Sequence, residues 1–189
     1  TAYMEKSIYR TVNYSKTLIT ELMIPSYANF GGKIHGGTIL SLMDKVAYAC
    51  SAKHAGGYCV TASMNVVDFL APVEVGDLVH LHASVNHVGT SSVTVGIRVE
   101  AESIITGEVR HTNSSYFTMV RLDATSKKAI PVPGLILETR EDMRRFLEAM
   151  KRKELVQEYK ANFKNTVDSL DLNRIEELLK DQNCQIQGT

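Results

Sequence analysis

One segment of the chain has apolar residues at helical spacing. In most of the segments after it, apolar and polar residues alternate as they do in β-strands. Between residues 38 and 54, apolar side chains recur every three or four positions: Ile39, Leu42, Met43, Val46 and Cys50. This spacing predicts an amphipathic helix. Alanines beside the stripe widen it, so we expect the helix to be well buried. The pair Gly56-Gly57 is expected to end it.

The strand signals surround this helix. A strand is predicted near 18–23, before it, and four more are predicted after it, at 59–69, 79–85, 93–100 and 111–122. Residues 93–100 alternate with a period of two, which is typical of a half-buried antiparallel strand. We therefore expect an α+β domain in which a long helix is clasped by an antiparallel sheet.

The last third of the chain has a different character. Residues 135–189 hold 11 acidic and 10 basic residues in 55 positions. The turn-rich stretch 131–134 marks the boundary. We predict a core domain over 1–134 and a charged helical C-terminal extension over 135–189. Thr139 is a candidate N-cap, followed by an amphipathic stripe from Met143 to Met150, and a short last helix is predicted over 172–180, with Asp171 as its cap.

Charge and cysteine content narrow the function classes. The 21 basic residues balance the 21 acidic ones, so the chain lacks the basic excess of a nucleic-acid binder or a polybasic membrane anchor. No apolar run reaches the roughly 18 residues of a membrane span. Three scattered cysteines are too few for a disulfide framework, which favours a reducing, cytoplasmic location.

The loop before the helix is the first candidate for chemistry. It ends in His35-Gly36-Gly37, so backbone N–H groups at the helix start could bind an anion or polarise a carbonyl oxygen as an oxyanion hole. The alternative is a glycine-rich connection that only serves tight packing.

Asp44 is the second candidate, because Asp is an unfavourable residue inside a helix. It could belong to a solvated face. If sheet or subunit contacts enclose the helix, the carboxylate becomes a candidate base or nucleophile.

Other motifs argue against cofactors. His80 and His82 have a spacing that could bind metal, but no acid or cysteine follows nearby in the sequence to complete a ligand set. The glycine-rich nucleotide motifs G-x-G-x-x-G and Walker A are absent. We therefore expect no NAD, ATP or metal.

The stretch from Asn29 to Asp44 resembles the signature of hotdog-fold acyl-CoA thioesterases, especially the cytosolic brain-type acyl-CoA hydrolases and their bacterial relatives. The resemblance continues through 60–63, 68–69, 89–92, 131–133 and 138–139, and covers about 24–160. It implies a hotdog fold, with Asp44 as the catalytic acid and Asn29 supplied by the partner hotdog. It also implies a homodimer, assembled further into a hexamer as a trimer of dimers. Lys33 departs from the small polar residue of some relatives.

The implied reaction is hydrolysis of an acyl-CoA to a fatty acid and CoA. The thioester oxygen would face His35, Gly36 and Gly37, and Asp44 would act as general base or nucleophile. The acyl chain would lie beside the helix and the 59–69 strand. For the CoA phosphates the weak candidates are Thr90, Ser91, Ser92 and Arg98, although the first three also read as a plain hairpin turn.

Two other functions stay open at this point. A hotdog dehydratase acting on an acyl thioester would use a histidine, and His35 is the only candidate. A non-catalytic acyl-CoA sensor would bind the thioester without hydrolysing it.

Overall fold

The computed structural model describes residues 8–188, and the chain divides by its internal contacts after Ala149. The central element of the first unit is helix α2 (Gly36–Ala55). The His35 side chain caps its start, and Gly56 ends it with a φ of 69°, a left-handed conformation that favours glycine. The helix predicted over 38–54 is thereby confirmed.

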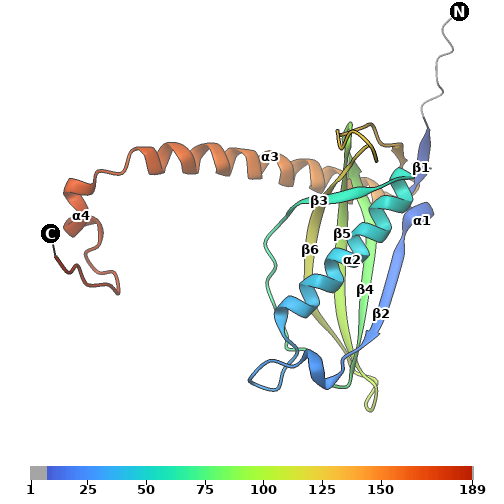
Figure 1. Ribbon diagram of the computed structural model, residues 1–189, viewed down its shortest axis with the longest axis horizontal. Helices are drawn as coiled ribbons and strands as arrows, with labels where there is room; N and C mark the ends of the chain where they lie inside the picture. Colours follow the sequence, from blue (N-terminus) through green and yellow to red (C-terminus); the bar gives the residue numbers. More distant parts are fainter. Residues whose placement is uncertain (1–7, 189) are drawn as a thin grey trace, which may run out of the picture. The chain divides into compact units, whose positions relative to one another are not determined.

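Five strands form one antiparallel sheet beside α2 (Figure 1): β2 (Thr17–Leu22), β3 (Cys59–Met64), β4 (Asp77–Val88), β5 (Ser92–Ser103) and β6 (Val109–Arg121). Their order is β2-β4-β5-β6-β3, so β2 and β3 are the edge strands. The α+β architecture, with a long helix against an antiparallel sheet, is confirmed.

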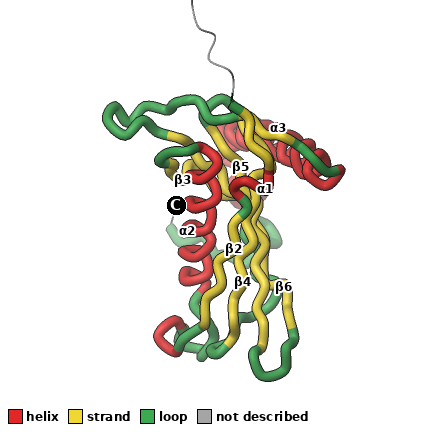
Figure 2. Tube along the Cα trace, turned by 90° about the vertical axis from the view of Figure 1, so that its right-hand side faces the viewer, coloured by secondary structure: helices red, strands yellow, loops and turns green. Residues whose placement is uncertain are grey.

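The core lies between α2 and one face of this sheet (Figure 2). Alternate residues of β4 and β5 turn toward the helix, because side chains of a strand point to opposite faces in turn. The helix contributes its predicted stripe. The buried apolar residues of these three elements are Ile39, Leu42, Met43, Val46, Ala47, Cys50, Ala55, Val79, Leu81, Ala83, Val85, Val93, Val95, Ile97, Val99 and Ala101.

The predicted strand over 59–69 is wrong in its second half, since β3 ends at Met64. Beyond it the hydrogen bonds to β6 no longer form a continuous ladder. At Asn65 the N–H donates to the Tyr116 carbonyl and the carbonyl accepts from the Ser115 hydroxyl, and the next backbone bond is from the Leu70 N–H to the Thr112 carbonyl. Between Asn65 and Leu70 the segment leaves the sheet. Residues 69–73 then line a cavity together with the first turn of α2.

Four short elements were not predicted: β1 (Tyr9–Thr11), α1 (Val12–Ser15), the 3-10 turn η1 (Pro25–Tyr27) and β7 (Gly134–Ile136). Strand β1 pairs with β7 in parallel. Each strand has three residues, and the two lie more than 120 positions apart in the sequence. Segments this short have no hydrophobic pattern from which a strand could be predicted.

The C-terminal extension is helical, as predicted. Helix α3 (Arg140–Asp168) starts with reciprocal bonds: the Asp142 N–H donates to Thr139 Oγ1, and the Thr139 N–H donates to Asp142 Oδ2, both at 3.0 Å. Its first ten residues belong to the first unit, where the Phe146 ring lies 4.6 Å from that of His87. The domain boundary after residue 134 stays a prediction.

The second unit, from Met150 on, contains the rest of α3 and two short turns, η2 (Leu172–Arg174) and α4 (Ile175–Leu178). Asp171 Oδ1 accepts from the Asn173 N–H, as expected of a cap. Among the helices of residues 8–188, none has the length and apolar character to cross a membrane.

Candidate active site

The start of α2 leaves the backbone N–H of Gly36 without a partner among residues 8–188. His35 Nδ1 accepts from the Gly37 N–H at 2.9 Å, and the Thr38 N–H donates to the His35 carbonyl at 2.9 Å. Of the predicted oxyanion group His35, Gly36 and Gly37, the geometry therefore leaves Gly36 as the backbone donor able to bind a carbonyl oxygen.

Gly36 and Gly37 each lie close to an aromatic ring, which leaves little space for a side chain at either position. A Cβ on Gly37 would lie 2.9 Å from the His35 ring, and a Cβ on Gly36 would lie 3.3 Å from the ring of Phe69. Contacts below 3.0 Å force a neighbour to move, so Gly37 is the stricter position. Packing thus explains the glycine at position 37, where the side-chain-free backbone lets His35 cap the helix, and the oxyanion role of the pair stays a prediction.

Asp44 lies two turns further along α2, where the isolated chain leaves it exposed. Thr61, on the edge strand β3, donates its hydroxyl hydrogen to Asp44 Oδ1 at 2.5 Å. The Thr61 oxygen also lies 3.5 Å from the sulfur of Met119. This fixes one carboxylate oxygen and leaves the other open. Thr61 was not assigned a role from the sequence, although it lies in the stretch 60–63 that carries the family resemblance.

Asn29 organises the loop before the helix. Its side-chain oxygen accepts from the N–H groups of Gly31 at 2.9 Å and Lys33 at 3.2 Å. The Gly32 N–H donates to the Asn29 carbonyl, and Gly32 has a φ of 78°, which favours glycine. With its oxygen committed to the loop, the exposed Asn29 side chain keeps its NH₂ group for other contacts.

Gly36 and Asp44 of one chain are too far apart to act on one carbonyl group. They are eight residues apart in a regular helix, which corresponds to about 12 Å along its axis. A base must lie within about 3 Å of the proton it accepts. Within one chain, therefore, these two groups cannot act together on one carbonyl.

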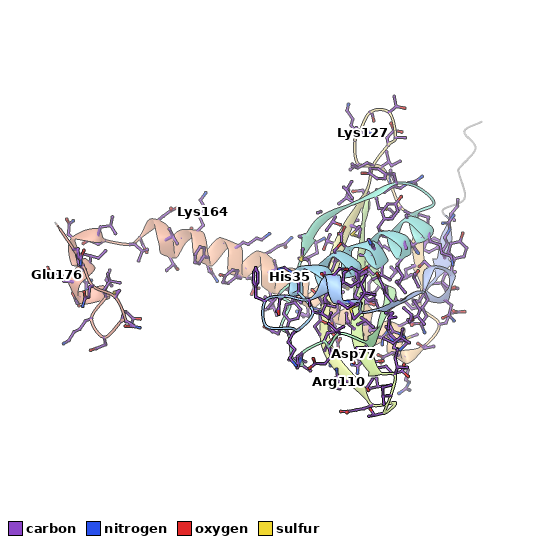
Figure 3. The ribbon with its side chains drawn as sticks, turned by 60° about the horizontal axis from the view of Figure 1, so that its bottom comes forward. His35, Asp77, Arg110, Lys127, Lys164 and Glu176 are labelled. Carbon is purple, nitrogen blue, oxygen red and sulfur yellow. The ribbon has the colours of Figure 1, made fainter. Side chains whose placement is uncertain are left out.

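A cavity of about 260 Å³ opens beside Gly36. The segment that directly follows its lining residues Pro72 and Val73 is held by an ion pair: Arg110 donates to Asp77 Oδ2 at 2.6 Å, and the same oxygen accepts from the Glu74 N–H. Asp77 is buried. Figure 3 shows Asp77 and Arg110 together, toward the same end of the domain as His35.

The four CoA candidates do not lie together. Thr90, Ser91 and Ser92 belong to the β4–β5 hairpin turn, which the Gly89 N–H closes by donating to the Ser92 carbonyl. Arg98 lies six residues along β5, about 20 Å from Ser92 at strand spacing. Its side chain donates to Glu100 and lines a second cavity, of about 440 Å³, on the face of the sheet that α2 does not cover.

His80 and His82 each lie beside a glutamate that is distant in the sequence. Glu102 lies 2.6 Å from His80, and Glu100 lies 3.4 Å from His82, across the β4–β5 ladder. Antiparallel pairing brings together residues that are 18 and 22 positions apart in the sequence. Within residues 8–188, no group of three or more His, Cys, Asp or Glu is arranged to hold a metal.

Comparisons with known proteins connect this geometry to a family. The profile of the thioesterase superfamily matches residues 31–108. The protein VdlD of Helicobacter pylori is 43% identical over 145 residues, covering 77% of this chain and 82% of VdlD. YkhA of Bacillus subtilis, an uncharacterized acyl-CoA thioester hydrolase, is 37% identical, covering 74% of this chain and 81% of its own.

The solved structures that are similar to this chain include acyl-CoA thioesterases and hydrolases. An apo-hexameric acyl-CoA thioesterase superposes with a TM-score of 0.78 at 37% identity, over 82% of this chain and 98% of its own. The acyl-CoA hydrolase of Staphylococcus aureus, in complex with butyryl-CoA and CoA, gives 0.75 at 29% identity, over 85% and 97%. Structures of the latter enzyme include alanine variants of an asparagine, an aspartate and a threonine.

Proposed function

The chain belongs to the thioesterase superfamily and is a thioester hydrolase with the hotdog fold, and on this premise we propose that it hydrolyses acyl-CoA to a free carboxylic acid and CoA. The observation that carries the proposal is the pair of half-sites on α2. Gly36 offers an unpaired N–H at one end, and Asp44, held by Thr61, offers a carboxylate about 12 Å away.

The half-sites become complete when two copies meet. If two α2 helices run antiparallel about a two-fold axis, Gly36 of each faces Asp44 of the other, and both sites form at once. The edge strand β3 supports this arrangement, since residues 61–64 are exposed and the outer edge of β3 has no strand partner among the described residues. An unpaired edge invites antiparallel pairing with a second copy.

The loop of Asn29 then belongs to the same site as Gly36, opposite Asp44 of the partner. The NH₂ group of Asn29 would donate to the attacking water or to the thioester. Three such dimers would form a hexamer, and the acyl-CoA thioesterase that this chain resembles at 37% identity is hexameric. The asparagine, aspartate and threonine chosen for variants in the Staphylococcus aureus enzyme are the residue types of Asn29, Asp44 and Thr61.

The reaction needs a base and an oxyanion donor. Asp44 takes a proton from water while the water oxygen attacks the carbonyl carbon, and the Gly36 N–H stabilises the negative charge on oxygen. Collapse of the tetrahedral intermediate breaks the C–S bond, and the proton passes from Asp44 to the CoA sulfur. In the nucleophilic route, Asp44 attacks the carbonyl itself, and water then hydrolyses the resulting anhydride.

Nothing in this chemistry requires a cofactor, and CoA enters as part of substrate and product. The proposal places the enzyme in the cytoplasm, with no membrane or nucleic-acid partner, and a cytosolic acyl-CoA thioester hydrolase of Rattus norvegicus, 30% identical over 144 residues, supports this location. A dehydratase is disfavoured, because His35 Nδ1 accepts from Gly37 and the remaining nitrogen of the neutral ring carries the proton.

The test measures free CoA thiol released from acyl-CoA substrates. We expect Asp44→Asn to lower kcat by about a hundredfold or more, with an unchanged circular dichroism spectrum. The matched control, Asp168→Asn at the end of α3, should keep wild-type turnover. Near-normal hydrolysis by Asp44→Asn would contradict both roles of Asp44. Hydration of an enoyl-CoA, or tight binding of acyl-CoA without thiol release, would favour the dehydratase or the sensor instead.

A further inference from the structure

The cavity beside Gly36 has an apolar lining. It is open to solvent on one side, has a volume of about 260 Å³, and is bordered by the loop before α2, the first turn of α2 and the segment after β3. Lys33 is its one charged lining residue. The others are Ile34, Gly36, Ile39, Phe69, Leu70, Ala71, Pro72 and Val73. Such a wall suits a hydrocarbon chain and not the amide groups of a pantetheine arm, which would lose hydrogen bonds there.

The cavity begins where the reacting carbonyl would bind. The Gly36 N–H is the unpaired donor, and the Phe69 ring lies directly against Gly36. Ile34, Ile39 and Val73 are buried and form the deeper walls. A thioester whose oxygen sits at Gly36 can therefore direct its acyl chain past Phe69 into the cavity.

The far wall is held in place. Lys33 and Glu74 form an ion pair and a backbone bridge across the rim, and the Arg110–Asp77 pair fixes the segment that follows. Lys33, the departure from the family pattern, therefore closes the rim of the cavity. These contacts connect the loop before α2 to the segment that follows Val73 and so favour one arrangement of the two.

We propose that this cavity is the acyl site, that it takes chains of about ten carbons, and that the Phe69 ring fills volume that a longer chain would need. The inference rests on the proposed hydrolysis of acyl-CoA. A 150 Å³ protein cavity holds benzene, with six carbons, so 260 Å³ holds about ten at the same density. Phe69 is about half exposed, so its ring can be removed without opening a hole in the core.

The experiment measures kcat/KM for CoA release across saturated acyl-CoAs from acetyl to palmitoyl. The wild type should peak near octanoyl and decanoyl. Phe69→Ala should move the peak to longer chains and raise the palmitoyl-to-octanoyl ratio by about tenfold. Ala71→Phe, which places a ring in the same cavity, should move the peak to shorter chains. The matched control Phe163→Ala, on α3, should leave the profile unchanged.

The possible failures are distinguishable. If no acyl-CoA releases CoA, the proposed function fails. If CoA is released but the wild-type optimum lies at acetyl or palmitoyl, or neither Phe69→Ala nor Ala71→Phe moves it, the function stands and the acyl-site assignment is overturned. The two variants shift the profile in opposite directions, so a general loss of activity cannot imitate the expected result.

Discussion

If each active site takes Asn29 from one chain and Asp44 from the other, two inactive variants should restore each other. Asn29→Ala damages the half-site at Gly36, and Asp44→Asn damages the half-site that lies about 12 Å further along α2. When equal amounts assemble at random, a site is intact only if both its contributing chains carry the native residue. The chance is one half for each chain, so about a quarter of the sites should recover.

The assay is CoA release after the two variants are unfolded together in urea, mixed and refolded. Each variant refolded alone supplies the background. A second mixture, of wild type with the double variant Asn29→Ala/Asp44→Asn, gives an independent readout. Sites shared between chains leave about a quarter of wild-type activity there, whereas sites within one chain leave about half.

Failure of complementation would refute the reasoning. If the mixture of single variants shows no activity above its parents while the refolded wild type is fully active, Asn29 and Asp44 act within one chain. The two half-sites on α2 would then need another explanation.

Three further predictions follow from single contacts. Thr61→Val should lower kcat about tenfold with little change in KM, because Asp44 loses the hydroxyl that fixes one of its oxygens, and Thr61→Ser should recover most of the loss. Arg110→Met should lower the free energy of unfolding in urea by about 2 kcal/mol, because buried Asp77 loses its charged partner. Burial holds the pKa of His54 below its ordinary value, so the folded state takes up its proton less readily than the unfolded state. Stability should therefore fall as the pH drops below about 6.5, by at most about 1.4 kcal/mol per pH unit, and His54→Gln should weaken this dependence.

Each of these has a contradicting outcome. A change in KM alone for Thr61→Val would indicate substrate binding and not positioning of the carboxylate. Unchanged urea midpoints for Arg110→Met would mean that Asp77 is stabilised by backbone donors alone. An identical acid dependence in wild type and His54→Gln would place the acid sensitivity in other groups.

Sequence reasoning found the long elements because their periodicity is local. The apolar stripe over 38–54 predicted α2, and the alternation over 93–100 predicted β5. It placed the end of β3 wrongly, since residues 65–69 have a strand-like composition but do not continue the ladder with β6. The pairing of β1 with β7 was missed for the opposite reason, because it depends on contact between distant segments.

The sequence by itself determined the buried helix, the glycine-rich loop before it and the one carboxylate set in its middle, since these are patterns of neighbouring residues. Only the tertiary structure showed which N–H remains free after His35 caps the helix, and which hydroxyl holds Asp44. It also showed that Arg98 lies far from the hairpin turn it was grouped with. The reason is physical: hydrogen bonds and contact distances depend on where strands and loops meet, and residues distant in the sequence meet only in the folded chain.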